Sequence, residues 1–388
     1  MDALPRIELL RSTNLSDDSY HSIVISVFRG MAAVQVVAAH VRAQSFPSLR
    51  SLDEPTLWYQ ALAFATGFAH QAVVVFFLLS GWLVGGSLLN RLHCPGALAN
   101  YAIDRVTRLW LVLIPAFLFA LFVGAMTLEV DPTRAGFGPD NEYSITAFVG
   151  NLVGVQDMAV PRFGGNFALW SLANETWYYV MFPLLVLCLA GSTPARRWSA
   201  GAAFVLLLAL LSFPITMFFL IWLLGVGFSR LRIHAACWQR WVMLAILVAV
   251  SVYFRLAGSN DKLIPESFVQ DLLFSLLFLV LLSSLQFPPG PGRLVAQIKT
   301  LGAALAAFSF TLYVVHVPLI QLFHYLHARR GDTVLSPVHL SHLGWYLLMV
   351  AGIVFAAWLF HLPFEAQTHR VRSAVKQAVR GKRVLTAS

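Results

Sequence analysis

Two ionisable side chains stand out within the apolar stretch 23–41. Arg29 and His40 are eleven positions apart in a segment that otherwise has the composition of a membrane-spanning helix. Eleven residues make about three helical turns, which places both side chains on one face about 16 Å apart along the axis. Charge at membrane depth is by default a sign of function. The pair therefore offers a fixed cation and a titratable base, whereas snorkelling of Arg29 and an interfacial His40 are the plainer alternative.

A carboxylate lies in a second apolar stretch, 167–190. The polar side chains that share one face of this predicted helix are Ser171, Asn174, Glu175 and Tyr178. Glu175 would lie about 12 Å from the outer end. Since an isolated carboxylate in hydrocarbon is very costly, we expect a partner within the membrane, and either Arg29 or His40 suits its depth. A charge pair that only fixes helix packing is the alternative.

Two further arginines, Arg105 and Arg108, are three residues apart and so lie on one helix face where the stretch 107–127 begins. Guanidinium groups at a membrane surface can grip phosphates through two parallel hydrogen bonds. On their own, these residues are equally well explained as the basic flank of a membrane span.

One more histidine, His316, precedes Pro318 in the apolar stretch 301–325. A single histidine on an apolar helix more often forms a packing hydrogen bond than a catalytic contact. The types and spacing of His316 and its neighbours therefore do not by themselves indicate chemistry.

The elements that must position these groups are membrane helices. The chain has 58% hydrophobic and only 12% charged residues, and its mean hydropathy is +0.72. Long apolar runs recur from end to end, which predicts an all-α, polytopic helical membrane protein with about ten spans. The predicted spans are 23–41, 64–88, 107–127, 167–190, 199–211, 214–229, 241–257, 267–287, 301–325 and 343–362.

Basic residues predict the orientation. If both termini lie on one side of the membrane, that side collects most of the 27 arginines and lysines, so that the positive-inside rule places the termini in the cytoplasm. Residues 1–22 lack the features of a signal peptide. They form a cytoplasmic segment, 23–362 form the membrane domain, and 363–388 form a basic cytoplasmic tail suited to a lipid surface. The longest outer loop, 128–166, is a candidate lid over an acceptor.

Several functions are disfavoured by what the sequence lacks. Its 3 cysteines, Cys94, Cys188 and Cys237, have neither the number nor the spacing for a disulfide framework or a metal site, so we expect no metal. We also expect no nucleic-acid partner, because no soluble basic domain is present. The stretch around Gly81 and Gly85 suits either close helix packing or access of a thin ligand.

Five blocks follow one another along the chain: FRGMAAVQVVAAH, VVVFFLLSGWLV, DRVTRLW, LWSLANETWYYVMFPLL and FSFTLYVVHVPL. Taken in order, they resemble the acyltransferase 3 family of membrane-bound O-acyltransferases that modify bacterial surface glycans. The resemblance runs from residue 23 to about residue 362. The sequence departs from the family pattern in two places along the chain. Leu111 stands where a proline is usual, and Asn174 and Thr176 flank the acid where many members have a second carboxylate.

The resemblance implies a role for each residue. His40 would be the general base, whose ordinary pKa of about 6.5 suits the task, and Glu175 would orient it. The donor would be a cytoplasmic acyl-coenzyme A, with acetyl-CoA as first choice, held by Arg29, Arg105 and Arg108. Candidate contacts for the substrate are Trp170, Ser171, Asn174 and His316.

We therefore expect an O-acyltransferase of the cell (inner) membrane that moves an acyl group to a hydroxyl of a glycan or glycoside. A transporter or flippase of a lipid-linked sugar would also bury Arg, Glu and His, and a structural membrane component would tolerate the loss of all three. The sequence leaves open the acceptor and the membrane face that holds it, the acyl length, a covalent intermediate and the oligomeric state.

Overall fold

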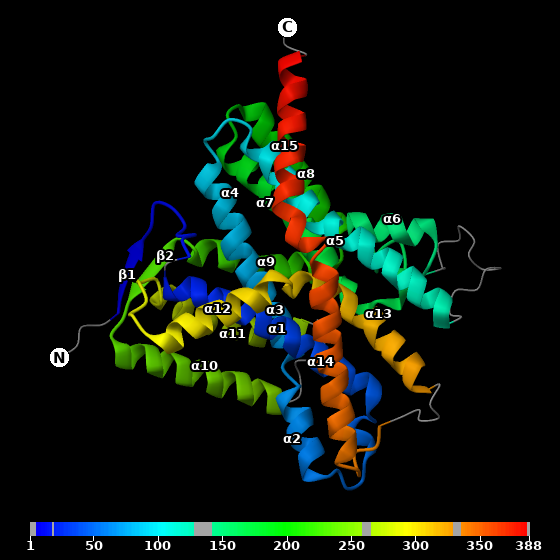
Figure 1. Ribbon diagram of the computed structural model, residues 1–388. Coiled ribbons are helices and arrows are strands. Elements are labelled where there is room, and N and C mark those ends of the chain that lie inside the picture. The colour runs from blue at the N-terminus through cyan, green and yellow to red at the C-terminus, as the bar shows by residue number, and fades with distance from the viewer. Residues whose placement is uncertain (1–4, 18, 128–141, 258–264, 329–334, 386–388) are drawn as a thin grey trace. The chain divides into compact units, whose positions relative to one another are not determined.

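The chain folds almost entirely into helices, as its composition predicts. A computed structural model describes residues 5–17, 19–127, 142–257, 265–328 and 335–385 (Figure 1). The helices are α1 Tyr20–Ser45, α2 Leu57–Ala65, α3 Ala69–Ser80, α4 Gly86–Arg91, α5 Ala97–Thr127, α6 Ile145–Val153, α7 Trp170–Ala190, α8 Pro194–Leu210, α9 Phe213–Phe228, α10 Cys237–Ala257, α11 Pro265–Ser284, α12 Arg293–Ala307, α13 Ser309–Ala328, α14 Ser341–His361 and α15 Thr368–Leu385.

The predicted spans all fall on helices. Eight helical stretches of the described residues are long and apolar enough to cross a membrane, which confirms a multi-pass helical membrane protein. The two short predicted spans, 199–211 and 214–229, correspond to α8 and α9. Of these two, α9 is apolar but shorter than a full span.

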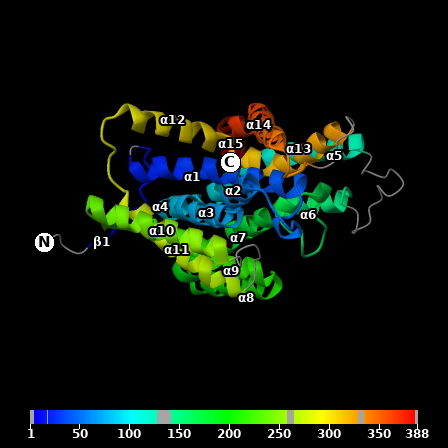
Figure 2. The ribbon, with the colours of Figure 1, turned by 90° about the horizontal axis from the view of Figure 1, so that it is seen from below.

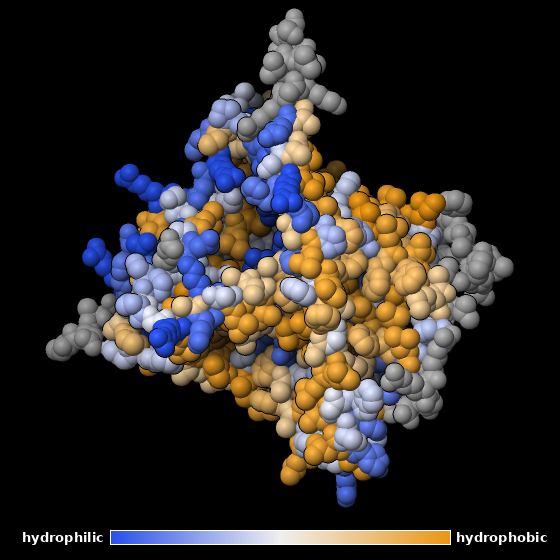
Figure 3. Space-filling view, in the orientation of Figure 1, coloured by the Kyte–Doolittle hydropathy of each residue, from blue (hydrophilic) through white to orange (hydrophobic). Residues whose placement is uncertain are grey.

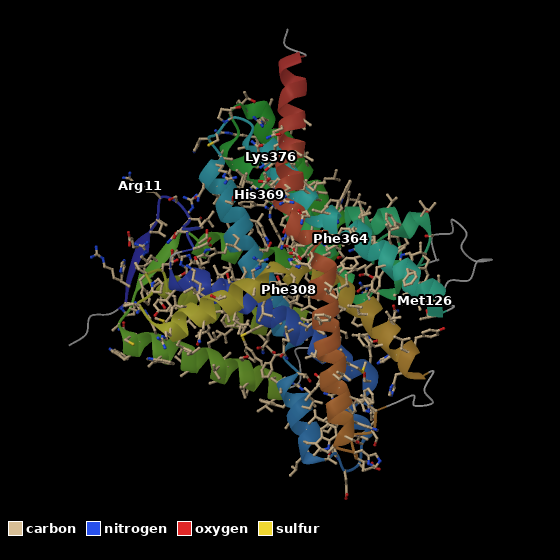
Figure 4. All side chains as sticks on the ribbon, in the orientation of Figure 1. Arg11, Met126, Phe308, Phe364, His369 and Lys376 are labelled. Atoms are coloured by element: carbon tan, nitrogen blue, oxygen red, sulfur yellow. The ribbon has the colours of Figure 1, made fainter. Side chains whose placement is uncertain are left out.

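The predicted span 301–325 is divided into two helices. The stretch 301–325 breaks at Phe308, between α12 and α13 (Figure 4). Beyond the break, the carboxylate of Glu365 accepts hydrogen bonds from the backbone N–H of Thr311 at 2.9 Å and from its hydroxyl at 2.6 Å. The first N–H groups of a helix have no partner within the helix, so this buried carboxylate caps the new helix. The apolar pattern runs unbroken across the junction and could not show it.

Within the described residues, two short strands are the exception to an all-helical fold. β1 (Arg6–Leu9) pairs antiparallel with β2 (Leu231–His234), with Glu8 opposite Arg232. The imidazole of His234 lies 2.8 Å from the Glu8 carboxylate, and this hydrogen bond lowers the pKa of Glu8 below its ordinary value. Part of the polar segment 1–22 therefore forms a strand that pairs with β2.

The predicted outer loop, 128–166, lies partly outside the described residues. Its described part contains α6, which Ser144 caps by accepting a hydrogen bond from the N–H of Ala147 at 3.0 Å. This part of the predicted loop is therefore ordered structure and not an irregular connection.

Contacts between Cα atoms divide the chain into two compact units. The first comprises Met1–Ala39, Phe64–His93 and Val180–Ala306, and the second His40–Ala63, Cys94–Tyr179 and Ala307–Ser388. Helices α1 and α7 each contribute to both units.

In the first unit, small residues serve close packing of α9 against the helix that α3 begins. A Cβ atom added to Gly81 would lie 2.0 Å from the carbonyl oxygen of Trp222, and one added to Gly225 would lie 2.2 Å from that of Leu78. Gly81 begins a π-helical turn, Gly81–Gly85, between α3 and α4. Of the two interpretations of this segment, the structure shows the packing role.

The second unit is built around α13, which packs against α5 and α14 and lies beside α14 in both ribbon views (Figures 1 and 2). Apolar side chains cover α14 and hydrophilic ones gather over α15 (Figure 3). Asp104 on α5 holds α15 through the ammonium of Lys376 at 2.5 Å and the guanidinium of Arg372 at 3.3 Å. His369 and Lys376 are labelled on α15 in Figure 4.

Candidate active site

The second unit brings two histidines into direct contact. Nδ1 of His40, on α1, lies 2.8 Å from Nε2 of His316, on α13. The rings are stacked with centroids 5.0 Å apart and planes 21° from parallel. Phe167 meets the His40 ring edge-on at 4.8 Å. His316 is fully buried and His40 is half-buried, so one imidazole supports another that is partly accessible.

His316 is fixed by the backbone of its own helix. Its Nδ1 lies 2.7 Å from the carbonyl oxygen of Tyr313, one turn earlier. The Tyr313 hydroxyl lies 2.6 Å from the hydroxyl of Ser171 on α7 and donates to the carbonyl of Ala168 at 3.2 Å. Ser171, predicted as a substrate contact, is thus hydrogen-bonded to the residue whose carbonyl holds His316.

A proline explains why an amide side chain lies beside this turn. Pro318 has no N–H, so the carbonyl of Val314, four residues earlier in α13, lacks its helical partner. Asn166 supplies the missing donor through Nδ2 at 2.9 Å. Gly164 and Gly165, with φ of 61° and 63°, form the left-handed turn that leads the chain to Asn166. Asn166 itself is buried.

Glu175 and Arg105 are linked by an aromatic ring. The hydroxyl of Tyr179, one helical turn after Glu175, donates to the Glu175 carboxylate. The guanidinium of Arg105 lies 5.4 Å from the centre of the Tyr179 ring and 5.9 Å from that of Tyr101. Its Nε is buried without a hydrogen-bond partner among the described residues. Orientation of His40 by Glu175 stays a prediction, since the hydrogen bond described for the His40 ring is the one between its Nδ1 and Nε2 of His316.

Arg108 has a different environment from Arg105. Its guanidinium lies 2.9 Å from the buried carboxylate of Glu365, which also caps α13 through Thr311. The same guanidinium lies 5.4 Å from the centre of the Phe310 ring. Although three residues apart on α5, the two arginines therefore have separate partners, and Arg108 is bound to the turn before α15.

The remaining predicted residues lie on the same helices. Trp170 begins α7 and is half-buried, and Asn174 is buried one turn further along. Arg29 is half-buried on α1, eleven residues before His40, in the part of that helix that belongs to the first unit.

Sequence reasoning overlooked several polar residues. Asn166 and Tyr313 build the His316 site, and Glu365 neutralises Arg108. In the first unit, His70 and Asp271 form a buried pair. For Asn166 a signal existed: Pro318 in an apolar helix leaves a carbonyl that needs an outside donor. The partners of Glu365 and His70 are far away in the sequence, so spacing gave no sign of them.

A comparison with known families identifies the class of the protein. A family model described as an acyltransferase domain, that of the acyltransferase 3 family, matches residues 23–362 of the 388. Together with its membrane helices, this match makes the chain a multi-pass membrane acyltransferase. It belongs to the acyltransferase 3 family. Neither a curated protein nor a solved structure matched the chain.

Proposed function

We propose that the protein is an O-acyltransferase of the cell membrane that moves an acetyl group from acetyl-CoA to a hydroxyl of a glycan. The observation that carries the proposal is the His40 imidazole, half-buried and held through Nδ1 by a second imidazole. Acyl transfer to an alcohol needs a base near neutral pH, and histidine is the usual choice. Membership of an acyltransferase family favours this function over a sugar transporter.

In the proposed reaction, His40 takes the proton of the acceptor hydroxyl as its oxygen attacks the thioester carbon. The new O–C bond forms a tetrahedral intermediate, the C–S bond then breaks, and His40 returns the proton to the departing sulfur. Ser171 and Asn174 are candidate hydrogen-bond donors to the oxyanion, and the Trp170 side chain is a candidate contact for the sugar. His40 thus acts as base and then as acid, with no net change in protonation.

The donor is proposed to be held by arginines. The Arg105 guanidinium is oriented by two tyrosine rings, and its buried Nε has no hydrogen-bond partner among the described residues, which suits an anionic ligand. Arg29 is proposed as a donor contact on the strength of the family resemblance alone. Arg108 is already paired with Glu365, so we give it the supporting role of ordering this surface of α5. The donor enters from the cytoplasmic side, on which both termini are proposed to lie.

The test uses purified full-length protein in detergent or nanodiscs, radiolabelled acetyl-CoA and a panel of glycan acceptors. We expect His40→Ala to lower the rate of transfer by about 100-fold or more while binding of coenzyme A persists, and Arg29→Ala to weaken donor binding. His324→Ala is the matched control, because His324 also links α13 to α1, at Ser45, with 3.0 Å between Nε2 and the hydroxyl. Full activity of the His40 variant would exclude it as the base, and unchanged binding by the Arg29 variant would exclude the donor contact.

Sidedness is tested separately. A single cysteine introduced at exposed Ile145 in the described part of the predicted outer loop, in a chain whose own three cysteines are replaced by serine, should react with an impermeant maleimide on intact cells. Reaction only after permeabilisation would reverse the proposed orientation.

A further inference from the structure

A chain of hydrogen bonds determines which nitrogen of His40 is basic. The carbonyl oxygen of Tyr313 can only accept, so Nδ1 of His316, at 2.7 Å, carries the hydrogen. A neutral imidazole has one N–H, which leaves a lone pair on Nε2 of His316. This lone pair faces Nδ1 of His40 at 2.8 Å, so Nδ1 of His40 is the donor. The lone pair of His40 is then on Nε2, the nitrogen further from the backbone.

We propose that His316 is a positioning residue that holds His40 in the tautomer whose Nε2 accepts the hydroxyl proton. This inference rests on the proposed function and reassigns His316 from substrate contact to support of the base. Its place in the fold suits that role, because His316 is fully buried and its backbone partner belongs to its own helix.

The protons balance through one turnover. The acceptor hydroxyl gives its proton to Nε2 of His40, and the ring becomes an imidazolium while Nδ1–H still donates to His316. That hydrogen bond becomes charge-assisted and therefore stronger as the charge develops. When Nε2 returns the proton to the sulfur of the departing coenzyme A, both rings are neutral again. A neutral partner adds no charge to a buried site before reaction, whereas a carboxylate there would need desolvation.

The surroundings hold His316 in one position. The hydroxyl of Tyr313 is fixed by Ser171 and by the carbonyl of Ala168, and the neighbouring Val314 carbonyl is fixed by Asn166. These contacts come from α7 and from the turn before it, so the turn of α13 that carries His316 is restrained from outside the helix. A rigid support of this kind is what a positioned base requires.

The experiment compares His316→Gln with His316→Leu. The amide oxygen of glutamine reaches the place of Nε2 and accepts from His40, whereas leucine has similar bulk and no acceptor. We expect His316→Leu to lower kcat by about 100-fold or more, within the range that loss of a base or its tautomer produces, with KM for acetyl-CoA changed less than about 3-fold. His316→Gln should stay within about 10-fold of wild type. His324→Leu and His324→Gln are the matched controls on the same helix and should behave alike.

Equal loss of kcat in the leucine and glutamine variants, or no loss in either, would overturn the inference. If the leucine variant does not fold, His316→Asn replaces it, because its shorter amide cannot reach His40 and should be as slow. Histidine ¹⁵N spectra, assigned by difference with His40→Gln and His316→Gln, give a readout independent of activity. Both rings should carry hydrogen on Nδ1, and hydrogen on Nε2 of either would overturn the proposal. A normal rate for His316→Leu beside an inactive His40→Ala overturns only this inference, whereas an active His40→Ala overturns the proposed base itself.

Discussion

Among the described residues, each unit of this protein has a histidine that is hydrogen-bonded to a buried partner, and the two partners differ in chemistry. In the second unit, His40 meets the neutral imidazole of His316 through Nδ1. In the first, His70 on α3 meets Asp271 on α11, and both carboxylate oxygens lie within 2.9 Å of its Nε2. The side chains of His70 and Asp271 are only 9% and 2% exposed. Both histidines lie on apolar helices, so composition does not separate them.

The two histidines differ in which ring nitrogen forms the hydrogen bond to the buried partner. A carboxylate only accepts, so Nε2 of His70 must donate to it, and the outer nitrogen of that ring is occupied. His40 is held through its inner nitrogen, and its outer nitrogen remains for a substrate. His70 therefore joins α3 to α11, whereas the arrangement of His40 suits the proposed role as a base.

Alanine substitution at each histidine tests this directly and should give the largest effect. We expect His40→Ala to lower kcat by between about 10² and 10⁴, the usual contribution of a general base. His70→Ala should leave kcat per folded molecule within about 3-fold, because its ring makes no contact with substrate in this proposal. Rates are measured with radiolabelled acetyl-CoA and normalised to the folded fraction from size-exclusion chromatography. A large loss of kcat in the His70 variant would contradict the distinction between a structural His70 and a catalytic His40.

The free energy of unfolding, in contrast to kcat, should depend strongly on the His70–Asp271 pair. Removing only the carboxylate, in Asp271→Leu, leaves a buried imidazole without its partner and should cost about 3–5 kcal/mol of unfolding free energy. The double variant His70→Leu/Asp271→Leu should recover most of it, since a buried polar pair can be replaced by apolar side chains with little loss. Chemical unfolding in mild detergent measures both. A double variant as unstable as the single one would contradict a purely structural pair.

The support around His316 should give a smaller effect. Asn166→Ala leaves the Val314 carbonyl buried without its side-chain donor, and we expect a cost of about 1–3 kcal/mol. The control is Pro318→Ala, alone and combined with Asn166→Ala, because alanine restores the backbone N–H that α13 lacks. If the combined variant is no more stable than Asn166→Ala, the missing N–H of Pro318 is not the reason why the Val314 carbonyl needs Asn166 as a donor.

The smallest effect belongs to a third pair, in which Glu8 and His234 join β1 to β2 at the surface. The pKa of Glu8 is lowered in the folded state, so its contribution is present above the unfolded value and is lost as pH falls through the folded one. The β1–β2 pairing should therefore loosen as pH drops below about 4.5, the ordinary Glu pKa. Limited proteolysis near residue 10 at pH 6 and at pH 4 measures it. Glu8→Gln should remove the pH dependence, and a pH dependence that persists in this variant would mean that another group causes it.

Much of the fold followed from residue types alone. Apolar length predicted all eight helical stretches of the described residues that are long enough to cross a membrane, because a helix that does so needs a long run of apolar side chains. The two short predicted spans, 199–211 and 214–229, are not among these eight. The break at Phe308 could not be predicted, because the carboxylate that caps α13 comes from Glu365, 54 positions after Thr311. The β1–β2 pair was missed for the same reason, since its strands are short and distant in sequence.

Prediction of the candidate site was more uneven. Arg29, His40 and Glu175 were noticed because ionisable groups are rare in apolar runs. Their partners were not predictable, because a hydrogen bond between helices depends on how the helices pack and not on spacing within one of them. His316 was singled out by resemblance, yet its contact with His40 became visible only in the structure. His70 escaped notice although it too is ionisable, since no family block covers it.

The separation of His40 from His316 along the chain is 276 residues, and this has a consequence for biogenesis. The ribosome completes α1 long before it synthesises α13. For that period α1 is present without His316, the hydrogen-bond partner of the His40 imidazole. The proposed catalytic arrangement can then be assembled only near the end of translation. A chain released before α13 is made would therefore contain His40, the proposed base, without His316, its proposed support.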